Sequence, residues 1–387
     1  MGRLIAAVRK NHNVARHSSL LPQTWVLADG NASTDYAATR VAAALGLAHH
    51  TKQALGSRLS VPLARALAGL GSLVGVRSAG ELQFVGDALG SGLPRFAVAA
   101  SKRALPGLLE IKRLSKARTT TVYIGLPDTR LAQFDVLVLS RLDQMVLRRL
   151  GPARANLDNA VSTLLPLSGA GPATPLPEST RTVVVCIGSG VEPTGFRLMS
   201  ADVDCLAEGL AHFPRSRIRI VLSPGLHPRL RPMVESRLIH RVRQQQAERA
   251  GSITSGAVDM DVIDYAQPGQ PALANVVASA TQVVATADYV ASVSLAAALQ
   301  RPIYIAGEER TYGLLRDYYH LLETKNLVRR FYPKGSRYSY MLAPDIGGAV
   351  DVFSAVRDHE PWATHDAKKD LDDVAAFIRA RYREKMS

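Results

Sequence analysis

Residues 183–190 have the sequence VVVCIGSG, an uncharged and mostly β-branched run that ends in two glycines. Such a run is typical of a buried strand that enters a small-residue loop. Residues 26–30, VLADG, repeat this pattern near the start of the chain. Outward from these two stretches, similar apolar runs predict strands at Trp25–Ala28, Phe96–Ala100, Thr121–Ile124, Val136–Leu139, Thr182–Ile187, Ile218–Leu222, Val283–Thr286 and Ile303–Ala306.

Segments of helical length, rich in Ala, Leu and Arg, separate these strands. In Ser33–Leu45, for example, Ala37, Val41 and Ala44 recur at helical spacing behind a Ser/Thr cap. Strands that alternate with helices indicate parallel sheets joined by crossover helices. The sequence therefore predicts an α/β protein.

Residues 168–180, SGAGPATPLPEST, show no periodicity and are rich in Gly and Pro, so we interpret them as an interdomain linker. The linker separates an N-terminal domain at 24–167 from a C-terminal domain at 181–364. Because both halves open with a strand and a glycine loop, we expect two similar units that face a cleft. A basic tail (1–23) precedes them, and an amphipathic helix with early acids and late arginines (365–387) follows.

The chain has 387 residues and a formal net charge of +14. This charge favours phosphates, anionic lipid headgroups or an acidic protein face. The basic residues are scattered and lack interleaved aromatic residues, so we do not expect nucleic acid as a partner. No acid precedes Asp29, a pattern shared by mitochondrial presequences and by frayed basic tails. The two cysteines are too few for a disulfide framework or a zinc site.

The functional loops of a parallel sheet lie at the carboxyl ends of its strands, where helix N-termini present N–H groups to anions. Four such loops supply the candidate ligands of a nucleotide or a phosphate: Asp29, Gly30, Ser101, Lys102, Arg103, Gly188, Ser189, Gly190, Thr286, Asp288, Ser292 and Ser294. Each glycine also fits a plain strand-to-helix turn, Ser101-Lys-Arg103 a solvated helix start, and Asp288 an N-cap.

The common catalytic motifs are absent from the sequence. It contains no GxSxG, HExxH or CxxC, no P-loop lysine, and no third glycine after Gly188-Ser-Gly190. Cys186 lies in an apolar run and is better explained as a core residue than as a nucleophile. We therefore assign no catalytic residue, no metal site and no cofactor.

Five blocks occur in the same order as in one known family. They are TWVLADGNASTDYAATRVAAALGL (24–47), AASKRALPGLLEIKR (99–113), FDVLVLSRLD (134–143), VVVCIGSG (183–190) and VVATADYVASVSLAAALQRPIYIAG (283–307). Together they resemble the mitochondrial fission proteins of the plant elongated-mitochondria type and their bacterial relatives. The resemblance implies two Rossmann-like domains that face a cleft, in an architecture like that of the two-domain B-type glycosyltransferases.

The chain also departs from this family at three positions. Ala28 replaces the threonine of the first loop, Tyr289 a serine, and Leu295 a glutamate of the following helix. In sugar-nucleotide transferases a carboxylate in this region holds ribose hydroxyls, because an ionised acid accepts two hydroxyl donors. Leu295 therefore weakens the case for binding a nucleotide-sugar.

Two functions follow from the resemblance. The first is a non-catalytic mitochondrial fission factor, peripheral on the outer mitochondrial surface, that helps recruit a dynamin-related GTPase and touches an anionic membrane. In a bacterial source the same protein is expected in the cytoplasm. The alternative is a glycosyltransferase that uses a nucleotide-sugar as its donor. The fold alone does not decide between them.

Overall fold

The computed structural model describes residues 24–29, 32–54, 84–85, 93–151, 157–167, 181–189, 196–210, 216–249, 259–267, 269–271, 273–331 and 362–387. The predicted tail (1–23) and linker (168–180) lie outside the described residues, as do Gly30 and Gly190. The domain boundaries drawn from the tail and the linker therefore stay predictions.

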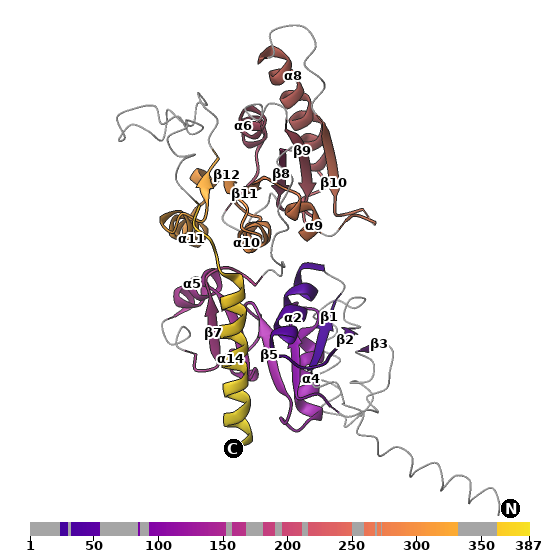
Figure 1. Ribbon diagram of the computed structural model, residues 1–387, viewed down its shortest axis with the longest axis vertical. Helices are drawn as coiled ribbons and strands as arrows, with labels where there is room; N and C mark the ends of the chain where they lie inside the picture. Colours follow the sequence, from indigo (N-terminus) through magenta and orange to yellow (C-terminus); the bar gives the residue numbers. More distant parts are fainter. Residues whose placement is uncertain are drawn as a thin grey trace, which may run out of the picture. The chain divides into compact units, whose positions relative to one another are not determined.

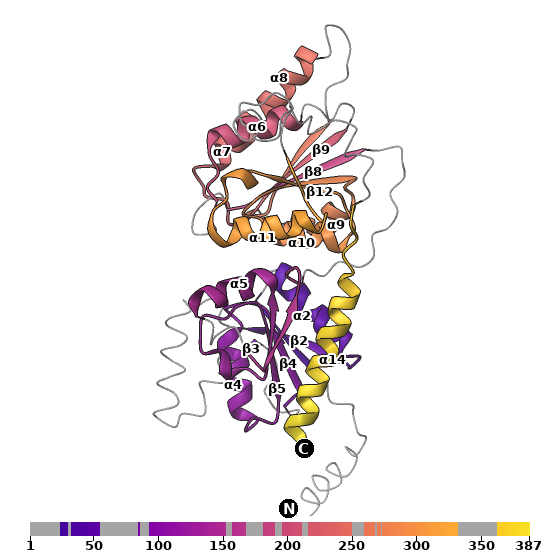
Figure 2. The ribbon, with the colours of Figure 1, turned by 90° about the vertical axis from the view of Figure 1, so that its left-hand side faces the viewer.

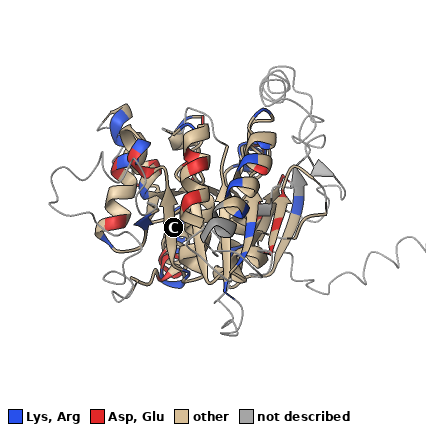
Figure 3. Cartoon of the chain, turned by 90° about the horizontal axis from the view of Figure 1, so that it is seen from above, with Lys and Arg blue, Asp and Glu red and all other residues tan. Residues whose placement is uncertain are grey.

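The chain forms two compact units that interleave along the sequence. Unit 1 comprises residues up to Leu139, Leu157–Ser162 and Leu371–Ser387, and unit 2 comprises Ser140–Asn156 and Thr163–Asp370. Figures 1 and 2 draw both units. Figure 3 shows lysines and arginines on several of their elements, with acids among them, so the positive charge is spread over the fold. Each unit is described below by itself.

Unit 1 is built on a seven-stranded sheet with the order β3-β2-β1-β4-β5-β6-β7 among the described residues. Strand β1 pairs in parallel with both of its neighbours, so that Thr24 lies opposite His49 and Phe96. The pairing of β2 with β3 is antiparallel. The strands are β1 (Thr24–Ala28), β2 (His49–Ala54), β3 (Phe84–Val85), β4 (Phe96–Ala99), β5 (Thr120–Ile124), β6 (Val136–Ser140) and β7 (Ala160–Thr163).

The helices of unit 1 cover this sheet with small or aliphatic side chains. Helix α2 (Ala32–Ala44) packs on β1 and β4 and buries Ala37, Ala38, Val41 and Ala42. Helix α4 (Leu105–Leu114) packs on β4 and β5 through Leu105, Leu108 and Ile111. A short 3₁₀ helix, η5 (Leu131–Gln133), precedes β6.

Unit 2 contains a six-stranded sheet with the order β10-β9-β8-β11-β12-β13, in which all pairs are parallel. Counted along this unit, the order is 3-2-1-4-5-6, which is that of a doubly wound Rossmann sheet. The strands are β8 (Thr182–Ile187), β9 (Arg217–Leu222), β10 (Met260–Asp264), β11 (Gln282–Thr286), β12 (Ile303–Ala306) and β13 (Arg329–Arg330). The predicted α/β class with parallel sheets is confirmed.

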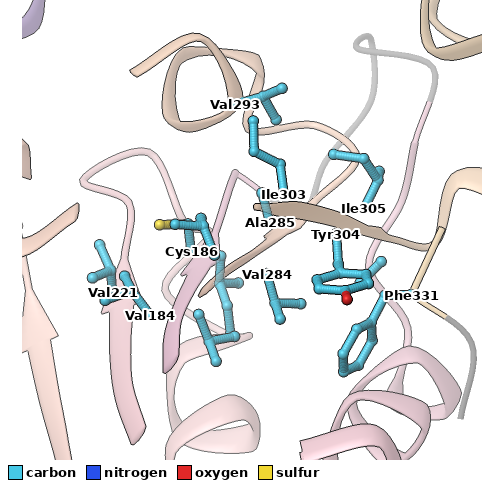
Figure 4. Close-up of a cluster of buried hydrophobic side chains, with 14 of the residues drawn as sticks. Val184, Cys186, Val221, Val284, Ala285, Val293, Ile303, Tyr304, Ile305 and Phe331 are labelled. Atoms are coloured by element: carbon cyan, nitrogen blue, oxygen red, sulfur yellow. The ribbon is translucent and has the colours of Figure 1, made fainter. Parts of the chain in front are cut away.

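Helices cover both faces of this second sheet (Figure 2). They are α6 (Ser200–Leu210), α7 (Arg231–Met233), the π-helical turn η7 (Val234–Leu238), α8 (Ile239–Arg249), α9 (Leu273–Ala278), α10 (Val290–Ala298), the 3₁₀ turn η8 (Glu308–Arg310) and α11 (Gly313–Thr324). A further helix of this unit, α5 (Arg141–Leu150), packs on α11. Because both faces are covered, the central strands are apolar throughout, and β8 is buried along its whole length. Figure 4 shows Val184, Cys186, Val284 and Ile305 among these packed side chains.

Two helices belong to a different unit from the strand or segment that precedes them. Helix α5 follows β6 of unit 1 but lies in unit 2, where Leu142 and Met145 pack on the core. Unit 1 differs in this respect from the continuous N-terminal domain predicted at 24–167, because Ser140–Asn156 belongs to unit 2. The predicted C-terminal helix is present as α14 (Ala367–Met386), which belongs to unit 1 from Leu371 onward.

Candidate functional site

The first predicted site residue, Asp29, is used to fix the start of a helix. It follows β1, and its N–H donates to the Asp35 Oδ1 at 3.0 Å. In return, the Thr34 hydroxyl donates to the Asp29 Oδ1 at 3.3 Å. Both partners come from the beginning of α2. Asp29 therefore connects the end of β1 with α2, and its predicted neighbour Gly30 is not among the described residues.

The second predicted group, Ser101-Lys102-Arg103, forms a turn between β4 and α4. Ser101 is buried, and its Oγ accepts a hydrogen bond from the Ala104 N–H at 3.1 Å. Lys102 and Arg103 are exposed. Helix α4 begins two residues later, at Leu105. The turn thus presents two cations to solvent at the carboxyl end of β4.

Four predicted residues of unit 2 meet where β8 and β11 end. The Gly188 N–H donates to the Thr286 Oγ1 at 2.8 Å, and the Thr286 hydroxyl donates onward to the Asp288 Oδ1 at 2.6 Å. The Ser189 hydroxyl donates to the Asp288 Oδ2 at 3.1 Å. We refer to Gly188, Ser189, Thr286 and Asp288 as the β8–β11 cluster. The shared sheet edge brings them together, because the strands are parallel neighbours.

Within this cluster, the Asp288 carboxylate lies directly against the backbone of Gly188. A Cβ added at Gly188 would lie 2.4–2.5 Å from the carboxylate atoms of Asp288. The absence of a side chain at Gly188 is therefore needed for the aspartate to pack here. Because the Gly188 N–H is already donated to Thr286, it is not available for a phosphate in this conformation.

Ser292 and Ser294 lie inside unit 2 rather than on a surface. Both are almost fully buried, and their hydroxyls donate to carbonyls of the same helical segment, Tyr289 O at 2.8 Å and Val290 O at 3.0 Å. Leu295 is part of the same core. Ser292, Ser294 and Leu295, which the sequence analysis considered as positions for binding a ribose, are therefore core residues of helix α10.

The buried thiol of Cys186 has the character of a core residue. Burial raises its pKa to about 12, although a hydrogen bond with the Ser292 side chain acts in the opposite direction. A thiol with a raised pKa is a poor nucleophile at neutral pH.

Polar residues continue from the β8–β11 cluster to the ends of the neighbouring strands β9 and β10. Three of them, Ser223, Arg231 and Asp264, were not selected by the sequence analysis. The Arg231 guanidinium forms an ion pair with Asp264 and donates to the Ser223 carbonyl at 3.0 Å. Ser223 directly follows β9, so the rule that selected Asp288 could have found it. Arg231 carries no such signal, because it lies beyond that loop, at the start of α7.

Tyr289 closes the edge beside the β8–β11 cluster. Its phenol is largely buried, and burial raises its pKa well above the usual value, opposed in part by a hydrogen bond with the Ser223 side chain. The phenol therefore stays protonated at neutral pH. Tyr289 stands where the resembled family typically has a serine, so a bulky side chain fills this position.

A buried acid, Glu308, follows β12 and was also missed. Its carboxylate is 3% exposed. The Arg330 Nε lies 3.1 Å from the Glu308 Oε2 and 2.6 Å from the Glu323 Oε1, so one guanidinium lies beside two carboxyl groups. Burial, together with the Glu323 charge, raises the pKa of Glu308 to about 8, against the attraction of Arg330. Glu308 is therefore mostly protonated at neutral pH.

Two features are absent from the described residues. These residues contain no group of three or more His, Cys, Asp and Glu side chains arranged to hold a metal ion. Among the described helices, none combines the length and the apolar character needed to cross a bilayer.

Comparison with known proteins identifies the family. Residues 37–382 match the family model described as "Mitochondrial fission ELM1", which agrees with the resemblance found from the sequence blocks. No curated protein matches the chain.

Solved structures with a similar fold include several glycosyltransferases. A mutant of S. aureus TarM has 9% identity and a TM-score of 0.34, with 75% of this chain and 50% of that chain covered. The glycosyltransferase SnogD from Streptomyces nogalater has 10% identity and a TM-score of 0.39, with 93% and 94% covered. The putative UDP-N-acetylglucosamine 2-epimerase from Listeria monocytogenes has 8% identity and a TM-score of 0.47, with 94% and 96% covered.

The chain thus spans about half the length of TarM. At such scores and identities these likenesses support no conclusion about activity.

Proposed function

Since the chain belongs to the Mitochondrial fission ELM1 family, we propose that it is a peripheral mitochondrial fission factor, an adaptor that helps recruit a dynamin-related GTPase to mitochondria. The observation that carries the proposal is the extent of the family match, which includes residues of both units. An adaptor needs folded surfaces and no reacting group.

The β8–β11 cluster supports an adaptor better than a transferase. A nucleotide-sugar site at this edge needs backbone N–H groups for phosphate and a carboxylate for ribose. Here the Gly188 N–H is donated to Thr286, and both oxygens of Asp288 accept hydroxyl hydrogen bonds from the chain itself. The position of the expected glutamate is occupied by Leu295, which lies in the core.

The test is rescue of mitochondrial division in cells that lack their own member of the family. The full chain, fused to a fluorescent protein, is expected to shorten the elongated mitochondria and to restore GTPase foci on them. The matched variants are Lys102→Gln/Arg103→Gln, which removes the exposed cations after β4, and Ser189→Ala, which removes one hydroxyl from the β8–β11 cluster. Both should rescue as well as the wild type. Rescue that is lost in these variants, at unchanged melting temperature, would point to ligand chemistry instead.

The alternative function is a nucleotide-sugar-dependent glycosyltransferase. One observation favours it: Lys102 and Arg103 are exposed at the carboxyl end of β4, where an open α/β sheet commonly binds phosphates. Calorimetric titration of UDP, a UDP-sugar and inorganic pyrophosphate into the full chain tests it. Binding that weakens about ten- to a hundredfold in Arg103→Ala, as expected for one charge-assisted contact, would support the transferase. If none of these ligands binds at millimolar concentration, the glycosyltransferase is excluded and the adaptor is the one candidate function that remains.

A further inference from the structure

Two large apolar side chains are exposed where helices α5 and α11 of unit 2 meet. Leu150, at the end of α5, is 58% exposed, and Tyr312, directly before α11, is 53% exposed. The two helices pack against each other (Figure 1). The Arg149 Nη1 lies 3.3 Å from the position that a Cβ would take at Gly313. Leu150 follows Arg149 and Tyr312 precedes Gly313, so both exposed residues are next in the chain to this contact.

Three exposed arginines lie close to Leu150 and Tyr312 in the chain. Arg148 and Arg149 are exposed in the last turn of α5, and Arg316 is exposed in the first turn of α11. Arg316 lies three residues after Gly313 and therefore on nearly the same side of the helix. Among the described residues, no carboxylate forms an ion pair with any of these three guanidinium groups. The adjacent acid Asp317 is exposed and offsets only part of the charge.

Helices α5 and α11 also contact the core of unit 2, through other side chains. These apolar contacts are made by Leu142 and Met145 of α5 and by Leu315 and Tyr318 of α11. Arginines in a last turn also complement the helix dipole, which accounts for the charge of Arg148 and Arg149. It does not account for a leucine and a tyrosine that remain more than half exposed beside them.

We propose that this surface binds anionic lipid headgroups, with Leu150 and Tyr312 entering the interface between headgroups and acyl chains. We call it the α5–α11 patch and define it as Arg148, Arg149, Leu150, Tyr312 and Arg316. An anionic bilayer surface matches both features, because it attracts arginines and buries the apolar parts of leucine and tyrosine. The patch deepens the proposed function and rests on it for the peripheral location, since it supplies the contact with the membrane.

The experiment is co-sedimentation of the purified full chain with vesicles. One vesicle set contains phosphatidylcholine alone, and the other contains phosphatidylcholine and phosphatidylserine in equal amounts. The wild type should bind the anionic set and not the neutral set, and added salt should weaken the binding. Arg148→Gln/Arg149→Gln should reduce the partition coefficient about thirtyfold, because each arginine near an anionic surface contributes a factor of about five. Leu150→Asn/Tyr312→Ser should reduce it about tenfold.

The matched control is Arg229→Gln/Arg243→Gln, which removes the same charge from two other exposed positions of unit 2. The control pair should change binding less than about threefold, because only arginines close to the membrane surface contribute fully to binding. Melting temperatures establish that each variant folds, and the single variant Arg149→Gln replaces the pair if the pair does not.

Three results would overturn the proposal: equal binding to neutral vesicles, an equal loss in the control pair, or retention on immobilised polyglutamate without binding to either vesicle set. The last would assign the patch to an acidic protein. No GTPase is present in this assay. If the chain does not bind the vesicles, the patch proposal fails, while recruitment of the GTPase is tested separately by the rescue of mitochondrial division.

Discussion

At the scale of single residues, the contact between Gly188 and Asp288 is the tightest constraint on the β8–β11 cluster. Gly188→Ala should lower the free energy of unfolding by about 1–3 kcal/mol, the usual cost of forcing an extra methyl into a packed site. The reason is that the new Cβ would lie 2.4–2.5 Å from the Asp288 carboxylate. Urea unfolding of the full chain measures the change.

Gly225→Ala is the control for this prediction, because its Cβ would lie 3.6 Å from the Ser223 Oγ, an ordinary contact. It should leave stability nearly unchanged. The double variant Gly188→Ala/Asp288→Ala should recover part of the loss, since it removes the clashing carboxylate. If Gly188→Ala and Gly225→Ala cost the same, the close packing of Asp288 is not the cause.

A second residue-scale prediction concerns the stability of unit 2 against pH. The pKa of Glu308 is raised from 4.5 to about 8, first by burial and then by Glu323. The folded state therefore holds a proton that the unfolded state has already lost, and stability should fall as the pH rises from 4.5 to about 8. Glu308→Gln should flatten this part of the profile, because glutamine does not titrate.

The measurement is the free energy of unfolding at several pH values across that range. Asp317→Asn, which changes an exposed acid on α11, is the control and should leave the slope as it is in the wild type. A slope that persists in Glu308→Gln would assign the effect to another group.

At the scale of elements, helix α14 is held to unit 1 by a few polar contacts at its end. The Lys385 Nζ lies 3.1 Å from the Asp135 Oδ2 and donates to the Thr119 carbonyl at 2.8 Å. Burial tends to raise the pKa of Asp135, but hydrogen bonds from Thr121 and the charge of Lys112 outweigh it, so that the pKa is lowered. This carboxylate thus stabilises the fold at neutral pH, and that contribution is lost as the pH falls through its lowered pKa.

Lys385→Gln should therefore lower the stability of unit 1 by about 1 kcal/mol, the typical net value of a partly buried charged hydrogen bond. Lys369→Gln, which removes an exposed charge near the other end of α14, is the matched control. Hydrogen exchange should accelerate in the last turns of α14 in Lys385→Gln only. Equal exchange in both variants would show that apolar contacts, such as that between Phe96 and Tyr382 at 5.0 Å, hold the helix alone.

The sequence predicted the central elements well and the outer ones poorly. Predicted strands such as Val136–Leu139 and Ile303–Ala306 match β6 and β12 to within one residue, because strands buried on both faces must be apolar. Strand β2 has the sequence HHTKQA, and its first residues are exposed, so no apolar run indicated it. Strand β10, at the edge of its sheet, has the sequence MDVID, in which two acids interrupt the apolar residues. Such strands are determined by pairing rather than by composition.

The same limit applies to the candidate site. The rule that functional loops follow parallel strands selected Gly188, Ser189, Thr286 and Asp288, and the structure brings these four together. The rule could not distinguish loop residues from the helix behind them, so it also selected Ser292 and Ser294, which are buried. The rule could also have selected Glu308, which comes two residues after β12, but not its partners Glu323 and Arg330, because only the tertiary fold brings them to it.

At the scale of the whole molecule, we expect two separate regions to hold the protein on mitochondria. One is the acid-free N-terminal segment, which lies before the first strand, β1. The other is the α5–α11 patch of unit 2. A single weak membrane signal gives only reversible binding, whereas two signals on one chain multiply their effects. Removal of residues 1–22 should therefore release part of a fluorescent fusion into the cytosol, although the folded units remain intact.

Four fusions test this expectation: the full chain, the chain without residues 1–22, the variant Arg148→Gln/Arg149→Gln, and the variant with both changes. The mitochondrial fraction of fluorescence should fall in each single change and vanish in the combined one. The free energies of the two contributions should add, because the changes lie in different parts of the chain. The melting temperature of the truncated chain should equal that of the full chain. If the truncated fusion stays on mitochondria as the full chain does, the N-terminal segment is not an address, and the folded units make the contact by themselves.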